Sequence, residues 1–391
     1  MASIWLDQPA HIAVDRNGII ENRHYVHAAV VNAQGRLLFS LGDPSRMTLL
    51  RSCAKPAQTL AILEAGNPSQ YEQAEVALMC SSHSSEPFHV ARVMKMLDRA
   101  GYGEADLRCG SHESLDDRIN RIWARDDYDP TPATSNCSGK HAGMLAASKT
   151  LGLDITDYHH SDHPLSARVK TVTEELLTGG SSKNEVLWGV DGCNLPTPAA
   201  PLQVSAAMYA KFAEAKDASS KEDGPLLDGR TSLMARIFTA MYEHPEMVGG
   251  TDRFCTVLIR ACPGRLIAKL GADGTYCVGV RAGASIPYTG AVNWHNGKPD
   301  TFGLAVKIED GSTEALYTAV VEILVQLGFL PGDEEPWAVG EDYSSLRPFT
   351  KPSRHNTNGD VAGTSQCRFT LKQEWLQDPR QRGDPLRKDD V

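Results

Sequence analysis

Arg51-Ser-Cys-Ala-Lys-Pro-Ala-Gln58 is the stretch around which this chain is organised. It contains the Ser-x-x-Lys tetrad Ser52-Cys53-Ala54-Lys55 and precedes the apolar-rich run 59–65. If the tetrad is helical, Ser52 and Lys55 lie on one face, because residues three apart are neighbours on a helix. A neutral lysine amine beside a serine can take the hydroxyl proton and make the serine a nucleophile. Free lysine titrates near about 10.4, so such a site must lower the lysine pKa by burial or by a second cation.

The tetrad alone also fits a helix start with an N-cap serine and a solvated lysine. Three further polar segments separate the predicted helices and strands. They are Ser81–Glu86, Asn136–His141 and Asp191–Asn194. Lys269 stands in the strand-like run Leu266-Ile-Ala-Lys-Leu-Gly271, where it is either a side chain snorkelling at a strand end or a buried cation aimed into a site. These segments decide whether the tetrad is catalytic.

The composition is that of an ordinary globular protein, with 391 residues, 41% of them hydrophobic and 23% charged. The net charge is -10, and the 39 basic residues are spread along the chain, so we expect neither nucleic-acid nor membrane partners. No run approaches the roughly 20 apolar residues of a membrane helix, and no secretory signal is recognised at the N-terminus. The nine cysteines are an odd number, which argues against a disulfide framework and favours a cytoplasmic setting with reduced thiols.

The order of predicted elements indicates one discontinuous α/β unit over residues 1–335. Its antiparallel sheet is expected from about 12–50 and 250–330, covered by helices from a helical middle of about 52–245. The predicted strands are 25–31, 36–41, 253–259, 266–270, 275–281 and 303–309. A helix over about 312–328 is predicted from its apolar face. Residues 336–391 are expected to form a C-terminal extension that is partly flexible.

Five motifs, in register, resemble the asparaginase II family, the rhizobial-type or class 3 L-asparaginases. They are 51–58, Met79-Cys-Ser-Ser-His-Ser-Ser-Glu86, Ser135-Asn-Cys-Ser-Gly-Lys-His-Ala-Gly-Met-Leu145, Trp188-Gly-Val-Asp-Gly-Cys-Asn-Leu-Pro-Thr-Pro198 and Ala268-Lys-Leu-Gly-Ala-Asp-Gly274. The resemblance runs from about residue 12 to about 330 and is thin beyond it. It implies a fold like that of serine β-lactamases and penicillin-binding enzymes, in agreement with an early Ser-x-x-Lys and a late Lys-x-Gly strand.

The resemblance implies two Ser–Lys pairs in one cleft, Ser52 with Lys55 and Ser84 with Lys269. Two lysines close together repel, and this lowers the pKa of one enough for it to act as a base. Ser52 is expected to attack the side-chain amide of L-asparagine and to form a β-aspartyl ester that water hydrolyses. The second pair is expected to relay protons or to activate water.

The family resemblance also implies residues that hold substrate and metal. Arg51 and His141 are expected to help hold the amino acid, and Asp191 to meet its ammonium group. A zinc ion is expected on Cys137, Lys140 and Cys193; without the resemblance, the two cysteines are better interpreted as buried free thiols. The resemblance further implies a homodimer.

Two other functions stay open on the sequence. The chain is expected to be an L-asparagine amidohydrolase, but a β-lactamase-like serine hydrolase acting on another amide uses the same residues. A non-catalytic zinc-binding or ligand-binding protein of the same fold is the third possibility. His159-His160-Ser-Asp-His163 has the residue types of a metal cluster, but it precedes Pro164 at a predicted helix start, and we interpret it as a loop.

Overall fold

The computed structural model describes residues 9–179, 185–220, 228–282, 294, 301–332 and 343–374. Its centre is an antiparallel sheet of nine strands in the order β10-β11-β1-β2-β9-β8-β7, in which β3 also pairs with β2 and β12 with β3. The long strand β2 allows the sheet to curl, because its first half pairs with β1 and its second half lies between β9 and β3. These strands are β1 (His11–Arg16), β2 (Ile19–Asn32), β3 (Leu37–Leu41), β7 (Leu266–Gly271), β8 (Thr275–Val280), β9 (Phe302–Ile308), β10 (Ser353–His355), β11 (Val361–Arg368) and β12 (Lys372–Gln373).

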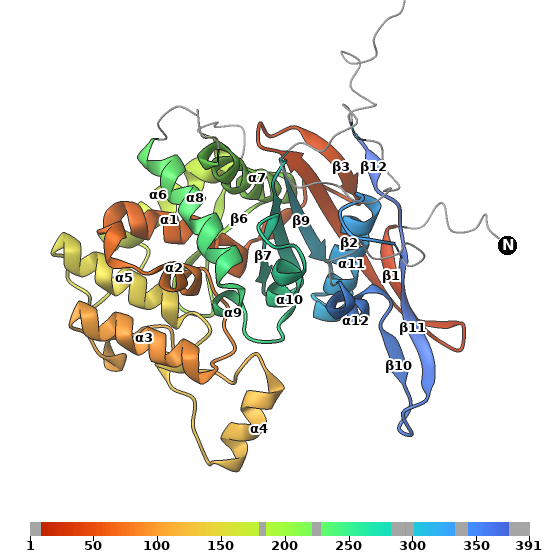
Figure 1. Ribbon diagram of the computed structural model, residues 1–391, viewed down its shortest axis with the longest axis horizontal. Helices are drawn as coiled ribbons and strands as arrows, with labels where there is room; N and C mark the ends of the chain where they lie inside the picture. The colour runs from red at the N-terminus through yellow and green to blue at the C-terminus, as the bar shows by residue number, and fades with distance from the viewer. Residues whose placement is uncertain are drawn as a thin grey trace, which may run out of the picture.

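Helices cover both faces of this sheet, which is why β8 and β9 are buried along their whole length. On one face α7 packs against β9, and a side chain on Gly303 would lie 1.8 Å from the Ala206 carbonyl oxygen. On the other face α10 lies against β7 and α11 against β9 and β11. Figure 1 shows the resulting layers, with the larger helical part on one side of the sheet and α11 and α12 on the other.

The described residues contain twelve α-helices, most of them in the middle of the chain. They are α1 (Lys55–Ala65), α2 (Gln73–Met79), α3 (Pro87–Ala100), α4 (Asp117–Arg125), α5 (Ser138–Leu151), α6 (Pro164–Thr178), α7 (Leu202–Ser219), α8 (Gly229–Glu243), α9 (Pro245–Val248), α10 (Phe254–Ala261), α11 (Thr313–Gln326) and α12 (Arg347–Thr350). Helices α1, α2, α5, α6 and α8 pack mainly on one another and form the helical part.

A second, small sheet joins the helical part to the start of α1. Its three antiparallel strands are ordered β4-β6-β5, with β4 (Met47–Leu49), β5 (Leu187–Val190) and β6 (Pro196–Pro201). The turn between β5 and β6 carries residues 191–195, and β4 leads directly into residue 51. Two of the polar segments predicted from the sequence are therefore held side by side at one end of this sheet.

The α/β class, the antiparallel sheet and the helical middle predicted from the sequence are confirmed. The hairpin over 25–41, the strands at 266–270, 275–281 and 303–309 and the helix near 312–328 are all present. The predicted strand 253–259 is wrong, because this run is the helix α10. The sheet is also larger than expected, since β11 pairs with β1 and β12 with β3, both beyond residue 330.

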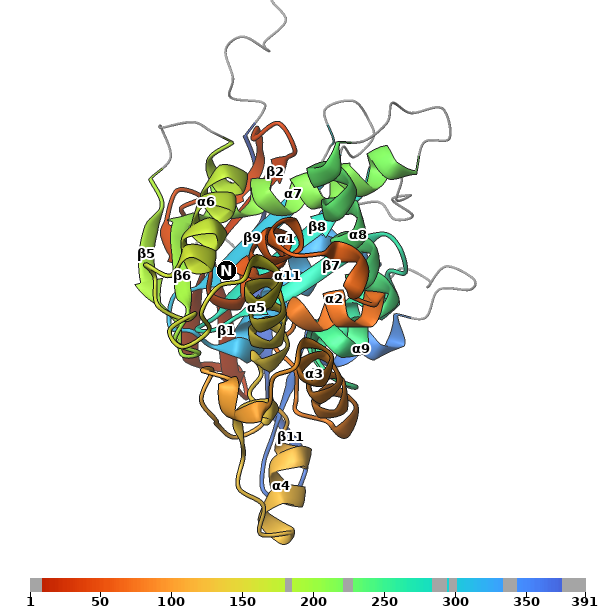
Figure 2. The same cartoon turned by 90° about the vertical axis from the view of Figure 1, so that its left-hand side faces the viewer.

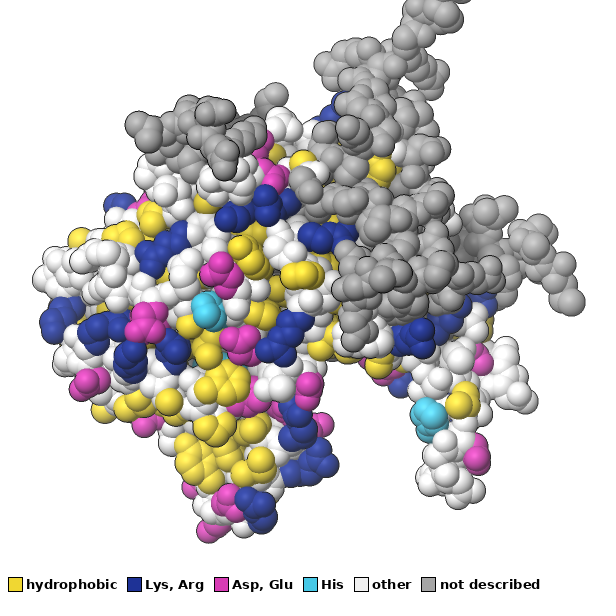
Figure 3. Space-filling model, viewed as in Figure 1, with side chains coloured by type: hydrophobic (Ala, Val, Ile, Leu, Met, Phe, Trp, Pro, Cys, Tyr) yellow, Lys and Arg dark blue, Asp and Glu magenta, His cyan; other side chains and the backbone are white. Residues whose placement is uncertain are grey.

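The surface around α4 is unusually apolar. Figure 3 shows hydrophobic side chains gathered over this helix, which projects from the body in Figure 1. Leu115, Ile122 and Tyr128 are 41%, 43% and 42% exposed there. None of the helices in the described ranges combines the length and the apolar character needed to cross a membrane.

Candidate active site

The polar segments converge where the helical part meets β7. Figure 2 looks onto the helical part, with α1 and α5 in front of the central sheet. Residues 51–54 form a short 3₁₀ turn, and Lys55 is the first residue of α1. Residues 81–86 connect α2 to α3, and Cys137 is the N-cap residue of α5. Each segment is thus an irregular stretch next to a helix end, where polar groups are free to point into a site.

Three of these segments contain a non-glycine residue with a left-handed backbone. Arg51 has φ of 50°, Ser85 of 60° and Asn194 of 70°. Such conformations cost of order 1–3 kcal/mol each and persist only where the surroundings enforce them. Three such residues in these polar segments indicate that side-chain contacts, rather than the intrinsic backbone preference, determine the local conformation.

The first motif is tied to strand β7 by close backbone contacts. The Cys53 thiol donates to the carbonyl of Lys269 at 3.2 Å. A side chain on Gly271 would lie 2.5 Å from the Leu50 carbonyl oxygen, so only glycine fits at this crossing. These contacts bring Lys269 next to Lys55 although the two are far apart in sequence.

Ser82 accepts hydrogen bonds from both buried lysines. Its Oγ lies 2.7 Å from Lys269 Nζ and 3.3 Å from Lys55 Nζ. Lys55 also donates to the carbonyls of Ser81 and Asn136, and Lys269 to that of Leu270. Lys55 and Lys269 are therefore close together, as expected, but they share the hydroxyl of Ser82 and not that of Ser84.

The expected pair of Ser84 with Lys269 is not formed. Ser84 is fully buried, and its Oγ donates to the carbonyl of Gly249 at 3.0 Å and accepts from Arg253 at 3.3 Å. The Gly249–Gly250 backbone packs closely on this serine. Ser84 therefore joins the segment after α2 to the loop after α9, and it does not face the lysines.

Burial lowers the pKa of Lys269 to about 8, and the neighbouring Lys55 charge acts in the same direction. The sequence predicted repulsion between lysines as the main cause, whereas desolvation is the larger one. Lys269 therefore loses its proton more readily than a free lysine does.

Ser52 lies beside a cavity of about 300 Å³. The cavity is also lined by Arg51, Asn136, Cys137, Asp191 and Cys193, among other residues. Ser52 Oγ makes no hydrogen bond within the described part of the chain, so the expected contact with Lys55 is not formed here. Arg51 Nε donates to Asp191 Oδ1 at 2.7 Å, which holds a positive and a negative group together on the cavity wall.

The three expected zinc ligands lie together at this cavity. Lys140 Nζ is 3.7 Å from Cys193 Sγ, and the Cys137 thiol donates to Asn136 Oδ1 at 2.8 Å. Cys137, Lys140 and Cys193 are all nearly inaccessible to solvent, at 4%, 2% and 5% exposure. Gln58 Oε1 accepts from Lys140 at 3.1 Å and orients the amine.

The two cysteines of this cluster differ in how readily they lose a proton. The neighbouring Cys137 thiol, together with the Lys140 charge, lowers the pKa of Cys193 to about 6 against the effect of burial. The neighbouring Cys193 sulfur and burial raise the pKa of Cys137. Burial favours a neutral Lys140, but the two cysteines and Asp191 raise its pKa overall. One thiolate beside one ammonium is the resulting state.

His141 is placed deeper than the other expected substrate residues. It is fully buried, and its Nδ1 accepts from the Tyr158 hydroxyl at 2.7 Å. Burial lowers the pKa of His141 to about 3, so the ring is neutral. His141 is not among the described residues that line the cavity, so it does not reach the space beside Ser52.

A family model for L-asparaginase II matches residues 12–367, which is nearly the whole chain. This chain belongs to the L-asparaginase II family. Comparison with curated proteins finds no match. Membership of the L-asparaginase II family supports an amidohydrolase of asparaginase type acting on a small molecule. The match also reaches about 37 residues beyond the point near 330 where the motifs thin out, in keeping with the pairing of β11 in the sheet.

Two residues of this L-asparaginase II site were missed on the sequence. Ser82 stands in the same quoted motif as Ser84, and an irregular segment has no period that tells which serine faces the lysines. Gln58 ends the first motif and was given no role. Its position three residues after Lys55 on α1 was the available signal, because such residues share a helix face.

Proposed function

We propose that this protein is an L-asparagine amidohydrolase that releases L-aspartate and ammonia. The observation that carries the proposal is Ser82, which accepts hydrogen bonds from Lys55 and Lys269. Lys55 also donates to the carbonyl of Asn136, which lines the same cavity as Ser52. A pure binding protein has no need of two buried lysines around a hydroxyl, because burying their charges costs free energy. The cavity of about 300 Å³ suits a ligand as small as one amino acid.

Ser52 is the proposed nucleophile because it borders the cavity, whereas Ser82 is 5% exposed and Ser84 fully buried. Its Oγ forms a bond to the side-chain amide carbon of asparagine, and its proton passes to Lys269 in the neutral form of that amine, which the lowered pKa of about 8 makes accessible. The C–N bond then breaks, and the leaving nitrogen takes that proton and departs as ammonia. Water adds to the β-aspartyl ester, its proton returns to Ser52, and aspartate is released.

The ion pair of Arg51 and Asp191 is the proposed holder of the amino-acid end of the substrate. An α-amino acid carries an ammonium and a carboxylate, and the cavity wall offers one charge of each sign 2.7 Å apart. Arg51 and Lys140 keep Asp191 ionised, since together they lower its pKa against the effect of burial. Asp191 would meet the ammonium group and Arg51 the carboxylate.

Zinc is the proposed cofactor, held by Cys137, Lys140 and Cys193. The donor set fits, because thiolates suit zinc and the Cys193 pKa of about 6 makes that thiolate available at neutral pH. Lys140 and Cys137 must lose their protons, so zinc uptake releases protons. When bound, zinc would supply a Lewis acid that polarises or orients the substrate.

We also propose a fold like that of serine β-lactamases, a cytoplasmic location and a homodimer. The fold agrees with α1 beginning at the Ser-x-x-Lys tetrad and with Lys269 on β7. The cytoplasmic location agrees with nine cysteines that form no disulfide. A homodimer is proposed from the family resemblance, and sedimentation of the purified chain tests it, since a single monomeric species would contradict it.

Two assays run side by side test the proposed activity. One measures ammonia released from asparagine and from glutamine, and the other the hydrolysis of a chromogenic β-lactam. Wild type should release ammonia from asparagine, and Ser52→Ala should not, while Ser111→Ala, at an exposed serine, should behave as wild type. Absence of ammonia release from asparagine by the wild type would refute the proposal. Hydrolysis of the β-lactam instead would favour a β-lactamase-like serine hydrolase.

Metal analysis tests the zinc ligands independently of activity. We expect Cys137→Ser to lose bound zinc and Cys367→Ser to retain it, because Cys367 lies on β11 and bonds to Thr318. Equal zinc in wild type and Cys137→Ser would refute this ligand set.

A further inference from the structure

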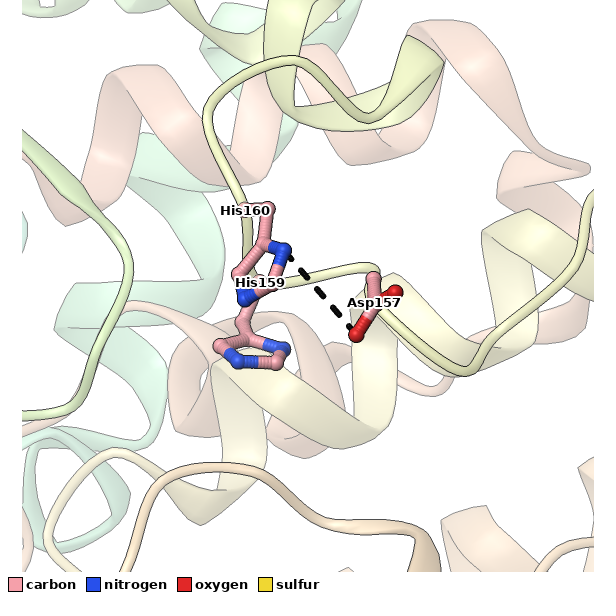
Figure 4. A group of neighbouring side chains, drawn as sticks. All are labelled: Asp157, His159 and His160. Atoms are coloured by element: carbon pink, nitrogen blue, oxygen red, sulfur yellow. Dashed lines mark ion pairs between the residues drawn. The ribbon is translucent and has the colours of Figure 1, made fainter.

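Three side chains with metal-binding donor groups gather on the loop between α5 and α6. They are Asp157, His159 and His160, and one donor atom of each lies within 4.8 Å of the other two. Figure 4 shows the three side chains on one short stretch of the loop, with the His160–Asp157 contact as a dashed line. None of the three is among the described residues that line the cavity beside Ser52. The sequence interpretation of this segment as a plain loop leaves these donors unexplained.

Other residues hold the loop in place. His163 caps α6, with its Nδ1 accepting from Leu165 N at 3.2 Å and its Nε2 donating to the Asp154 carbonyl at 2.8 Å. Tyr158 is buried and bonds to His141. The backbone is therefore fixed on both sides of the cluster, so binding a metal would not have to pay the entropy of ordering a free loop.

The donor groups of the cluster are not satisfied by one another. His159 Nδ1 is inaccessible to solvent and has no hydrogen-bond partner within the described residues, which is costly for a ring nitrogen. His160 Nδ1 lies 3.9 Å from Asp157 Oδ1, too far for a direct hydrogen bond. Three ligand-type groups thus face a common point without closing on each other.

The spacing is close to what a metal ion requires. Zinc–nitrogen bonds are about 2.0–2.1 Å, so two ligand atoms on a tetrahedral zinc are about 3.3 Å apart. The observed 3.9 Å between His160 and Asp157 closes to that value by a small rotation of two exposed side chains. We propose that Asp157, His159 and His160 bind a divalent transition-metal ion at a second site, separate from the thiol cluster.

Two imidazoles and a carboxylate favour zinc, cobalt, nickel or copper over magnesium and calcium, which prefer oxygen ligands alone. Three protein ligands leave at least one coordination position open. His159 and His160 border a hollow of about 790 Å³, whose wall includes Lys170 stacked 5.3 Å from the Trp188 ring centre. The open position therefore faces a space that admits water or a small anionic group.

Equilibrium dialysis of the full-length protein against Zn²⁺ tests this site. The arms are wild type, a variant carrying both His159→Asn and His160→Asn, and His355→Asn as the matched control. His355 is an exposed histidine on β10, far from the loop in sequence. We expect the double variant to bind one equivalent fewer than wild type and the control to bind the same. Circular dichroism and thermal melting establish that each variant is folded.

Cys137→Ser separates this site from the thiol cluster. It should keep the equivalent that the double variant loses, whatever its asparaginase activity. Titration of Cys137→Ser with Co²⁺ should give ligand-field absorption without a thiolate-to-metal charge-transfer band, and adding the two histidine substitutions should remove it. Equal zinc in wild type and the double variant, or unchanged Co²⁺ absorption when the two histidine substitutions are added to Cys137→Ser, would overturn the proposal.

Discussion

Ser82 and Ser84 are two residues apart and have opposite surroundings. Ser82 accepts from both lysines, while Ser84 donates to the Gly249 carbonyl. Because Ser82 accepts from two lysines, its own hydroxyl proton is available for a hydrogen bond to a third group. A serine bonded to a backbone carbonyl is a structural link. The two therefore have separable effects on substitution.

We expect Ser82→Ala to lower kcat for asparagine by about 10²–10⁴-fold, the range typical of lost proton transfer, with little change in melting temperature. Ser84→Ala should lower the melting temperature, because it leaves a buried carbonyl unpaired, and should retain most of kcat. Steady-state kinetics and thermal melts of both variants check this. The reverse pattern, with Ser84→Ala inactive and Ser82→Ala active, would restore the pairing expected from the sequence.

Lys269 gives the reaction a predictable pH dependence. Its pKa is lowered to about 8, so it is charged below that pH and neutral above it. If neutral Lys269 is the base, kcat/KM should rise as pH increases through about 8. Lys269→Met should lose activity, and so should Lys269→Arg, which keeps the cation but stays protonated. A Lys269→Arg variant with the wild-type pH profile would exclude Lys269 as the base.

The site residues could be named from the sequence largely because the motifs resemble a family. Lys55, Lys269, Cys137, Lys140 and Cys193 do lie together, which no spacing rule predicts for residues so far apart. The expected contact of Ser84 with Lys269 is absent because side chains on irregular backbone follow local contacts, here the Gly249 carbonyl and the close Gly250 backbone. Burial and a second cation were both named as ways to lower a lysine pKa, but the sequence did not show that burial is the larger cause for Lys269.

At the scale of elements, the packing of α5 on α2 positions the thiol cluster. Gly139 lies in the first turn of α5, and a side chain there would come within 2.5 Å of the Leu78 carbonyl oxygen. This approach holds Cys137 and Lys140, which flank the glycine, against the segment that carries Ser82. The glycine is needed for space and not for its backbone conformation.

Gly139→Ala should therefore push α5 away from α2. We expect a loss of about 1–3 kcal/mol in unfolding free energy, as for other overpacked cores, together with less bound zinc and lower activity. Gly229→Ala is the matched control, because no atom lies within 4 Å of its added carbon and the substitution should be neutral or slightly stabilising. Chemical denaturation of both variants measures the difference. Equal stability of the two would show that α5 is not closely packed here.

Helices and strands could be told apart from the sequence where the hydrophobic pattern extends over enough residues. Helix α11 and the strands β7–β9 have clear helical or extended patterns, and they were found. The run 253–259 is short and apolar, and such a run fits a buried strand or a helix equally well. The exposed residue of helix α10, Arg260, lies just beyond this run, after the buried Leu258 and Ile259. The run itself therefore shows no polar helix face. Tertiary packing against β7 decides for the helix.

At the scale of the whole molecule, the C-terminal strands complete a sheet begun by the N-terminal ones. Four residues of β1, from His11 to Val14, are paired with β11, and Ser40 and Phe39 of β3 with β12. The sequence predicted a sheet ending near residue 330, because β10–β12 are largely polar and partly exposed. Strands of this kind carry little apolar signal, so only their pairing partners reveal them.

This pairing predicts that the C-terminal strands are part of the folding unit. A chain ending at residue 351 lacks β10–β12 and should melt at a much lower temperature, since each lost hydrogen bond costs about 0.5–1.5 kcal/mol and buried Ile12 becomes accessible. A chain ending at residue 374 keeps every described element and should melt like wild type. Gly363→Ala tests the same contact without truncation, because its added carbon would lie 1.8 Å from the Asp15 carbonyl oxygen. Its melting temperature should also fall, while unchanged melting of both altered chains would mean that β11 does not support the sheet.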